Sequence, residues 1–147
     1  MTRKLGMVLA LAGVLGVLVL LLRSAPAHAT SGPNWKVTVH NTSPYGCAMN
    51  IWTVKGLEPY EKEFKYLAAG ETYTFQTGAR CPTALSGLIE VGGAQWREVR
   101  GTCLLTGAHQ DPIQCTATCW NSSWTICRKA GTDPAVINNN DFGFCKN

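Results

Sequence analysis

Cysteine is the residue type with the widest chemistry in this chain of 147 residues, which contains seven of them. Three lie in the short segment 115–127, together with two tryptophans. Clustered thiols form disulfides in an oxidising compartment, bind metal ions or carry out redox catalysis. The spacing Cys115-x3-Cys119-x7-Cys127 departs from the Cys-x2-4-Cys pairs of structural zinc sites, and no Cys-x-x-Cys redox motif occurs. We therefore predict disulfides, with no metal site and no cofactor.

Seven cysteines predict three bridges and one odd thiol, and six paired cysteines leave 15 connectivities open. The disulfide candidates are Cys47, Cys81, Cys103, Cys115, Cys119, Cys127 and Cys145. In an extended strand, Cys115 and Cys119 would lie about 13 Å apart, beyond the roughly 7 Å that a disulfide allows between Cα atoms. Those two therefore should not pair with each other, whereas Cys119 could face Cys127 across a turn or reach elsewhere. We expect the odd thiol to be buried, the alternatives being a bridge to another chain or a reactive group.

Aromatic side chains supply the second candidate chemistry, since the chain has five tryptophans and four tyrosines. The segment 115–127 reads as a hairpin, with a strand through Cys119 and Trp120, a polar turn at 121–123, and a return strand through Trp124. Trp120, Asn121 and Trp124 would then present two rings and an amide at the hairpin tip, where they could bind a carbohydrate or a protein ligand. The alternative use of both rings is core packing.

Catalytic motifs are almost absent. After residue 29 the only histidines are His40 and His109, and His109-Gln110-Asp111 is the one place where a carboxylate could orient a histidine base. The chain has no Gly-x-Ser-x-Gly elbow, no His-Glu-x-x-His and no glycine-rich phosphate loop. The sequence therefore leans against an enzyme.

The first residues read as a secretory signal. A basic start with Arg3 and Lys4 precedes an apolar run over 5–22, and Ala27-His28-Ala29 matches a signal-peptidase site. We predict a cleaved signal peptide at 1–29 and a single secreted domain at 30–147, extracellular or periplasmic according to the host. The alternative is an uncleaved N-terminal anchor, because the apolar run approaches the length of a membrane span.

Charge narrows the classes of partner. The formal net charge is +4, and without Arg3, Lys4 and Arg23 it falls to about +1. A nucleic-acid partner would need a basic face to replace counterions, so we predict none. Strong electrostatic attraction to anionic membranes is not indicated either.

Alternation of apolar and polar residues predicts short strands. Residues 35–40 and 47–54 read as strands, with Trp35, Val37 and Val39 inward, and 71–77 alternates with Tyr73 and Phe75 on one side. Gly92-Gly93 predicts a two-residue hairpin turn between 88–91 and 94–96, a register that turns Trp96 inward. The segment 103–106 reads as a short strand, the charged segment 56–65 as a solvated loop or helical turn, and 142–145 as a return to the body.

These elements define the fold class as all-β, a small disulfide-stapled antiparallel β-sandwich or barrel after a cleaved signal peptide. Asn41-Thr42-Ser43 and Asn121-Ser122-Ser123 match the N-glycosylation pattern on predicted turns, which matters only in a glycosylating host.

A family resemblance lies in the opening strands. It is carried by Trp35-Lys-Val-Thr-Val-His-Asn, then Ile51-Trp52, then Leu67-Ala-Ala-Gly-Glu-Thr-Tyr-Thr-Phe75. This stretch resembles the start of secreted β-sandwiches such as thaumatin-like proteins and plant self-incompatibility proteins, over about a third of the chain. The cysteine positions differ from those of both families. The resemblance implies a β-sandwich and carries over no function and no site residue.

Three functions fit this sequence. The leading hypothesis is a secreted non-enzymatic binding module for a carbohydrate or protein ligand. The second is a secreted membrane-active or toxin-like protein whose exposed tryptophans enter the lipid interface. The third is a small secreted hydrolase that would use His109 with Asp111.

Overall fold

Eight strands and one short 3-10 helix make up residues 33–147, the part of the chain that the computed structural model describes. The strands are β1 (Lys36–Asn41), β2 (Cys47–Val54), β3 (Glu61–Leu67), β4 (Thr72–Gln76), β5 (Cys81–Glu90), β6 (Trp96–Cys103), β7 (Ser122–Arg128) and β8 (Phe142–Lys146), with the 3-10 helix η1 (Pro112–Gln114) before β7. The predicted all-β class is confirmed. The predicted signal peptide lies outside the described residues. Within 33–147, no helix is long and apolar enough to cross a membrane.

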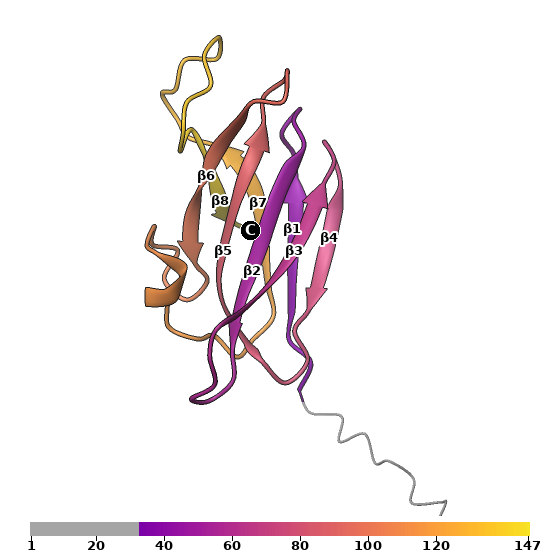
Figure 1. Ribbon diagram of the computed structural model, residues 1–147, viewed down its shortest axis with the longest axis vertical. Coiled ribbons are helices and arrows are strands. Elements are labelled where there is room, and N and C mark those ends of the chain that lie inside the picture. Colours follow the sequence, from indigo (N-terminus) through magenta and orange to yellow (C-terminus); the bar gives the residue numbers. More distant parts are fainter. Residues whose placement is uncertain (1–32) are drawn as a thin grey trace, which may run out of the picture. The chain divides into compact units, whose positions relative to one another are not determined.

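All eight strands belong to one mixed sheet, in the order β3-β2-β5-β6-β8-β7-β1-β4. Antiparallel pairing, expected throughout, holds for five of the seven neighbouring pairs, whereas β1–β7 and β6–β8 are parallel. The sheet curves until its edge strands β3 and β4 lie side by side (Figure 1). Lys65 of β3 links the two edges, with its ammonium 4.7 Å from the ring centroid of Tyr73 and 3.8 Å from the carboxylate of Glu71. The sheet is therefore nearly closed.

The inner face of this sheet is the core. Strand alternation places every second residue of β1 and β2 inside, so Val37 and Val39 are fully buried and the predicted bounds of β2 are confirmed. The largest buried side chains are Trp124, Phe75, Met49, Ile51, Leu67, Leu85, Ile89, Leu104 and Ile126.

Three disulfides and one buried free thiol are present, as predicted. The bridges are Cys81–Cys119, Cys103–Cys115 and Cys127–Cys145, and the free cysteine is Cys47. Cys115 and Cys119 do not pair with each other, and Cys119 and Cys127 each reach elsewhere. Burial raises the pKa of the Cys47 thiol to about 12, so it stays protonated and inert at neutral pH.

The predicted hairpin in 115–127 is wrong. Only its second half is a strand, β7, which pairs with β1 and β8 and not with the residues before it. Two interactions draw the first half to the start of β5. Cys119 is bridged to Cys81, and the Thr118 N–H and hydroxyl both donate to the Pro82 carbonyl, at 2.8 and 3.0 Å. A covalent partner far away in the sequence thus overrides local hairpin pairing.

Two further segments differ from prediction. Residues 61–65, expected in a loop or helical turn, form most of β3, an exposed edge strand in which Phe64 and Tyr66 stand among the charged residues Glu61, Lys62, Glu63 and Lys65. Charges on an edge strand prevent pairing with other chains, so they do not argue against a strand there. The expected strand at 103–106 is also wrong, because β6 ends at Cys103 and a turn follows in which Leu104 is buried.

The glycine-containing hairpin forms with its register shifted by one residue. The Val91 N–H donates to the Gln95 carbonyl at 2.9 Å, so the loop has three residues, and Gly92, Gly93 and Ala94 all have positive φ. Glu90 therefore pairs with Trp96, whereas the predicted two-residue turn would pair it with Gln95. A slip of one residue exchanges the two faces of a strand. Trp96, predicted inward, is accordingly half-exposed on the outer face.

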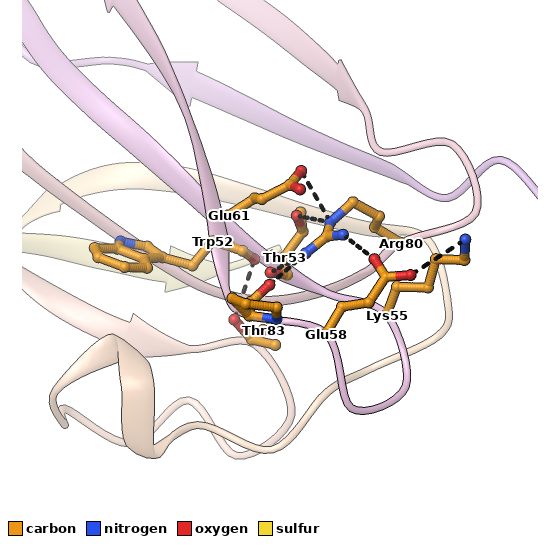
Figure 2. A network of polar contacts seen from close by, with 8 residues as sticks. Trp52, Thr53, Lys55, Glu58, Glu61, Arg80 and Thr83 are labelled. Atoms are coloured by element: carbon orange, nitrogen blue, oxygen red, sulfur yellow. Dashed lines mark hydrogen bonds and ion pairs between the residues drawn. The ribbon is translucent and has the colours of Figure 1, made fainter.

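A polar network around Arg80 fixes the turn between β2 and β3, as Figure 2 shows. The Arg80 guanidinium donates to the Glu58 carboxylate at 2.8 Å and to the Pro59 carbonyl at 2.7 Å, and lies 3.2 Å from Glu61. It also donates to the Thr53 hydroxyl at 3.1 Å. This one side chain joins the start of β5 to both ends of the turn, next to the Cys81–Cys119 bridge.

Candidate functional site

The outer face of β3, β2, β5 and β6 has two ends with different surroundings. At one end, which we name the covered end, Ala84, Cys103 and Cys115 form a second buried cluster, and the partly buried Trp52 packs against it. Segment 104–121, which contains η1, lies over it and is tied down by its disulfides. The Trp52 indole N–H donates to the Ser86 hydroxyl at 2.9 Å, and Ser86 lies at the boundary between the covered end and the other end.

The other end, which we name the open end, carries a groove of about 340 Å³. This sheet-face groove is lined by Ala48, Asn50, Phe64, Ser86, Gly87, Leu88, Glu98, Val99, Gly101 and Asn140. They come from four neighbouring strands and from the loop before β8, so the sheet itself forms most of the groove.

Apolar side chains stand along one side of the groove. Phe64 pairs with Asn50 in register, and 64% of its surface is exposed. Leu88, on the next row, lies between Ala48 and Glu98 and is half-exposed. Covering an exposed ring or aliphatic chain is favourable, so Phe64 and Leu88 are available for contact with another molecule.

Polar side chains are available beside these apolar ones. Within residues 33–147, no hydrogen bond uses the side chains of Asn50, Glu98 or Asn140. Two hydrogen bonds hold the loop before β8 against β6: the Asn140 N–H donates to the Glu98 carbonyl at 2.8 Å, and the Glu98 N–H donates to the side-chain oxygen of Asn139 at 3.0 Å. Asn140 has a φ of 64°, which the short loop requires. Two amides and a carboxylate are thus free to bind a ligand.

Two backbone features shape the strands that form the floor of the groove. A Cβ at Gly87 would lie 2.9 Å from the Ala48 carbonyl oxygen, so only glycine lets β5 approach β2 this closely. Between Leu85 and Gly87 the register with β6 moves by one residue, which places Arg100 and Gly101 together opposite Ser86. Such a bulge redirects the side chains that follow it.

Tyr66 lies beside the groove, in the same cross-strand row as Ala48 and Leu88. Its hydroxyl donates to the Glu90 carboxylate at 3.0 Å. The pKa of Tyr66 is raised, mainly by this hydrogen bond and to a smaller extent by burial and by the negative charge of Glu90. A side chain at Gly46 would collide with the Tyr66 hydroxyl, so the glycine gives the ring its place.

The predicted tip residues Trp120, Asn121 and Trp124 are not brought together as two exposed rings and an amide. Trp124 is 1% exposed and belongs to the core, whereas Trp120 is 42% exposed. The Asn121 side-chain oxygen accepts from the Lys36 N–H at 2.8 Å and so fixes the start of β1. Core packing, the alternative use, is what the structure gives Trp124.

The histidine and glycosylation candidates also differ from prediction: His109 is not hydrogen-bonded to Asp111, and Asn41 is buried. His109 Nδ1 donates to the Gly101 carbonyl at 3.1 Å, while the Asp111 carboxylate caps η1 by accepting from the Ile113 N–H. No hydrogen bond among the described residues joins His109 to Asp111. Asn41, expected on an accessible turn, is 1% exposed, and its amide donates to three backbone carbonyls. Its sequon is therefore inaccessible in the folded chain.

Sequence reasoning missed the sheet-face groove because Phe64 lay in a segment read as loop. The signal that could have found it is the alternation of Phe64 and Tyr66 with charged residues. Among residues 33–147, no three His, Cys, Asp or Glu side chains are grouped to bind a metal ion. Comparison with protein-family models, curated proteins and solved structures gives no match for this chain.

Proposed function

We propose that this protein is an exported, non-enzymatic binding module whose sheet-face groove binds a carbohydrate. The observation that carries the proposal is the exposed Phe64 ring beside a groove with free amides at Asn50 and Asn140 and a free carboxylate at Glu98. Sugars present C–H faces and hydroxyl edges. One aromatic ring with a few placed polar groups satisfies both.

Export is supported by the disulfides. Three intramolecular bridges in one small domain are typical of extracellular proteins, because the cytosol keeps thiols reduced. Peptide mass spectrometry on the exported protein should find an N-terminus at Thr30, three bridges and a free thiol at Cys47. An N-terminus before Thr30 would contradict cleavage after Ala29, and seven free thiols would contradict export to an oxidising compartment.

The groove is tested by binding measurements on one variant and one control. Soluble oligosaccharides chosen from a glycan array are titrated by calorimetry into the wild type, Phe64→Ala and Leu57→Ala. Phe64→Ala should weaken binding at least about tenfold, since a central aromatic contact dominates such sites. Leu57, fully exposed at the β2–β3 turn, should be replaceable without effect. Equal affinity of all three proteins would show that the groove is not the site.

A protein ligand is the second candidate. Tyr66 and Trp96 are half-exposed and, together with Leu88 in the groove, extend the apolar surface, as an interface would. Trp96→Ala separates the two candidates: it should leave oligosaccharide affinity unchanged and weaken a protein complex. Pelleting with neutral vesicles tests the membrane-active alternative on the same variants.

A further inference from the structure

A second concave site lies past Arg100, over the junction of β6, β8 and β7. We name this cavity of about 340 Å³ the basic pocket, because its lining includes Arg100, Arg128 and Lys129. The rest of its lining is largely apolar and includes Phe142 and the Cys127–Cys145 bridge. The pocket therefore combines positive charge with an apolar lining.

The positive charge in the pocket is not neutralised there. None of the residues 33–147 that line it is an aspartate or glutamate. Within the same range, the side chains of Arg100 and Lys129 have no hydrogen bond and no ion pair. Arg128 is held in place, because it donates to the Pro134 and Val136 carbonyls and lies 5.6 Å from the Phe142 ring. The pocket thus has one fixed cation and two that are free to bind.

The nearest carboxylates are engaged elsewhere. Asp111 and Asp141 line a neighbouring groove that shares Arg100 and Lys129 with the basic pocket. The Asp111 carboxylate accepts from the Ile113 N–H at 3.2 Å, and that of Asp141 accepts from the Asn138 N–H at 2.8 Å. Neither forms an ion pair with the pocket's cations, so an incoming anion would meet Arg100 and Lys129 unpaired.

Gly143 gives the pocket its room. An ideal Cβ at Gly143 would lie 3.7 Å from both the Arg100 Cβ and the His109 Cε1, so these two side chains flank the glycine. Because His109 Nδ1 donates to the Gly101 carbonyl, the ring orientation is set. The bulge opposite Ser86 places Arg100 next to Gly143 in the lining of the basic pocket.

We propose that the basic pocket binds a carboxylate group carried on a small apolar body. Arginine presents a planar pair of donors that matches a carboxylate, and lysine adds a second charge. The apolar lining gains nothing from a strongly hydrated inorganic ion but is stabilised when a hydrocarbon group covers it. This inference does not rest on the carbohydrate proposal: Asn140 lines both sites, but the cations that would bind the carboxylate line the basic pocket and not the sheet-face groove.

The test uses the oxidised full-length secreted protein, labelled with ¹⁵N, and two probes of the same shape. Phenylacetate should shift the amide signals of Arg100, Lys129 and Gly143, and phenylacetamide, which lacks the charge, should bind at least about tenfold more weakly. Arg100→Gln should lower phenylacetate affinity about tenfold and Lys129→Gln about threefold. Gly143→Ala, whose added methyl meets its neighbours at ordinary contact distance, should lower affinity with the folded spectrum retained.

Controls separate this site from a general attraction to positive charge. Lys146→Gln removes a lysine of β8 outside the pocket and should leave phenylacetate affinity unchanged. Equal binding of the amide, inorganic sulfate binding as tightly as phenylacetate, or an equal loss in Lys146→Gln would each overturn the proposal. Phe64→Ala should leave phenylacetate binding intact and Arg100→Gln should leave oligosaccharide binding intact, so failure at one site is distinguishable from failure at the other.

Discussion

The covered end and the open end belong to the same four strands, yet only one of them is sealed. At the covered end, Trp52 and Ala84 are overlaid by a segment that two disulfides hold against the sheet. At the open end, Phe64 and Leu88 occupy equivalent outward positions and remain 64% and 43% exposed. Burial of an aromatic or aliphatic side chain stabilises a fold by roughly 1.5–3 kcal/mol. Segment 104–121 covers the apolar side chains at one end of the sheet face. The apolar side chains at the open end remain exposed to solvent.

The largest expected difference between the two ends is in the free energy of unfolding, when segment 104–121 loses a disulfide. Replacing Cys103 and Cys115 together by alanine frees a 12-residue loop, and we expect a loss of about 3 kcal/mol in the free energy of unfolding. Urea denaturation measures it. The matching change at the open end, Phe64→Ala, should cost less than about 0.5 kcal/mol, because that ring is mostly exposed. Similar losses in the two proteins would mean that the ends do not differ in their contribution to stability.

A smaller effect is expected from the polar network at the covered end. Arg80→Gln removes contacts to Glu58 and Glu61 from a side chain that is only 15% exposed, and should cost about 2 kcal/mol. Lys55→Gln is the matched control: it removes an exposed ion pair to the same Glu58 and should cost less than about 0.5 kcal/mol. Thermal unfolding of both variants compares them, and an equal shift would assign Arg80 no special part in holding the turn.

The smallest effect tests the interior beneath the open end, where Cys47 is buried. In the unfolded chain this thiol ionises near its ordinary pKa of 9.0, whereas the folded chain holds the proton until about pH 12. Above pH 9 the unfolded state therefore binds fewer protons, and stability should fall by about 1.4 kcal/mol per pH unit until about pH 12. Cys47→Ala should lack this contribution. Urea denaturation of both proteins below pH 9 and at one pH unit above it measures this difference in the free energy of unfolding. The same pH dependence in both proteins would show that the Cys47 thiol is accessible to water.

The strands that alternate on a buried face could be predicted from sequence. Val37 and Val39 in β1 and the bounds of β2 follow from a period of two, because one side of each strand meets the core. The disulfide count followed from the cysteine count and the expected compartment. The strand β3 was missed because its charged residues matched the composition of a loop, although an edge strand uses the same composition to stay unpaired.

The places of two tryptophans, Trp96 and Trp124, could not be predicted from the sequence, for two physical reasons. The first is register: one extra residue with positive φ at Ala94 moved Trp96 from the inner to the outer face. The second is connectivity, since sequence alone does not distinguish among 15 disulfide patterns. The bridge from Cys81 to Cys119 pulled the predicted hairpin apart and left Trp124 in the core.

The parallel pairing of β1 with β7 also determines when the fold can form. Val37 pairs with Ser122, 85 residues further along the chain, and β1 has only β4 beside it until β7 has been synthesised. Contacts between residues so distant in sequence form late, because the intervening chain must first lose its freedom. The strand order thus keeps the sheet incomplete, with β1 unpaired on one side, until the last strands have emerged from the ribosome.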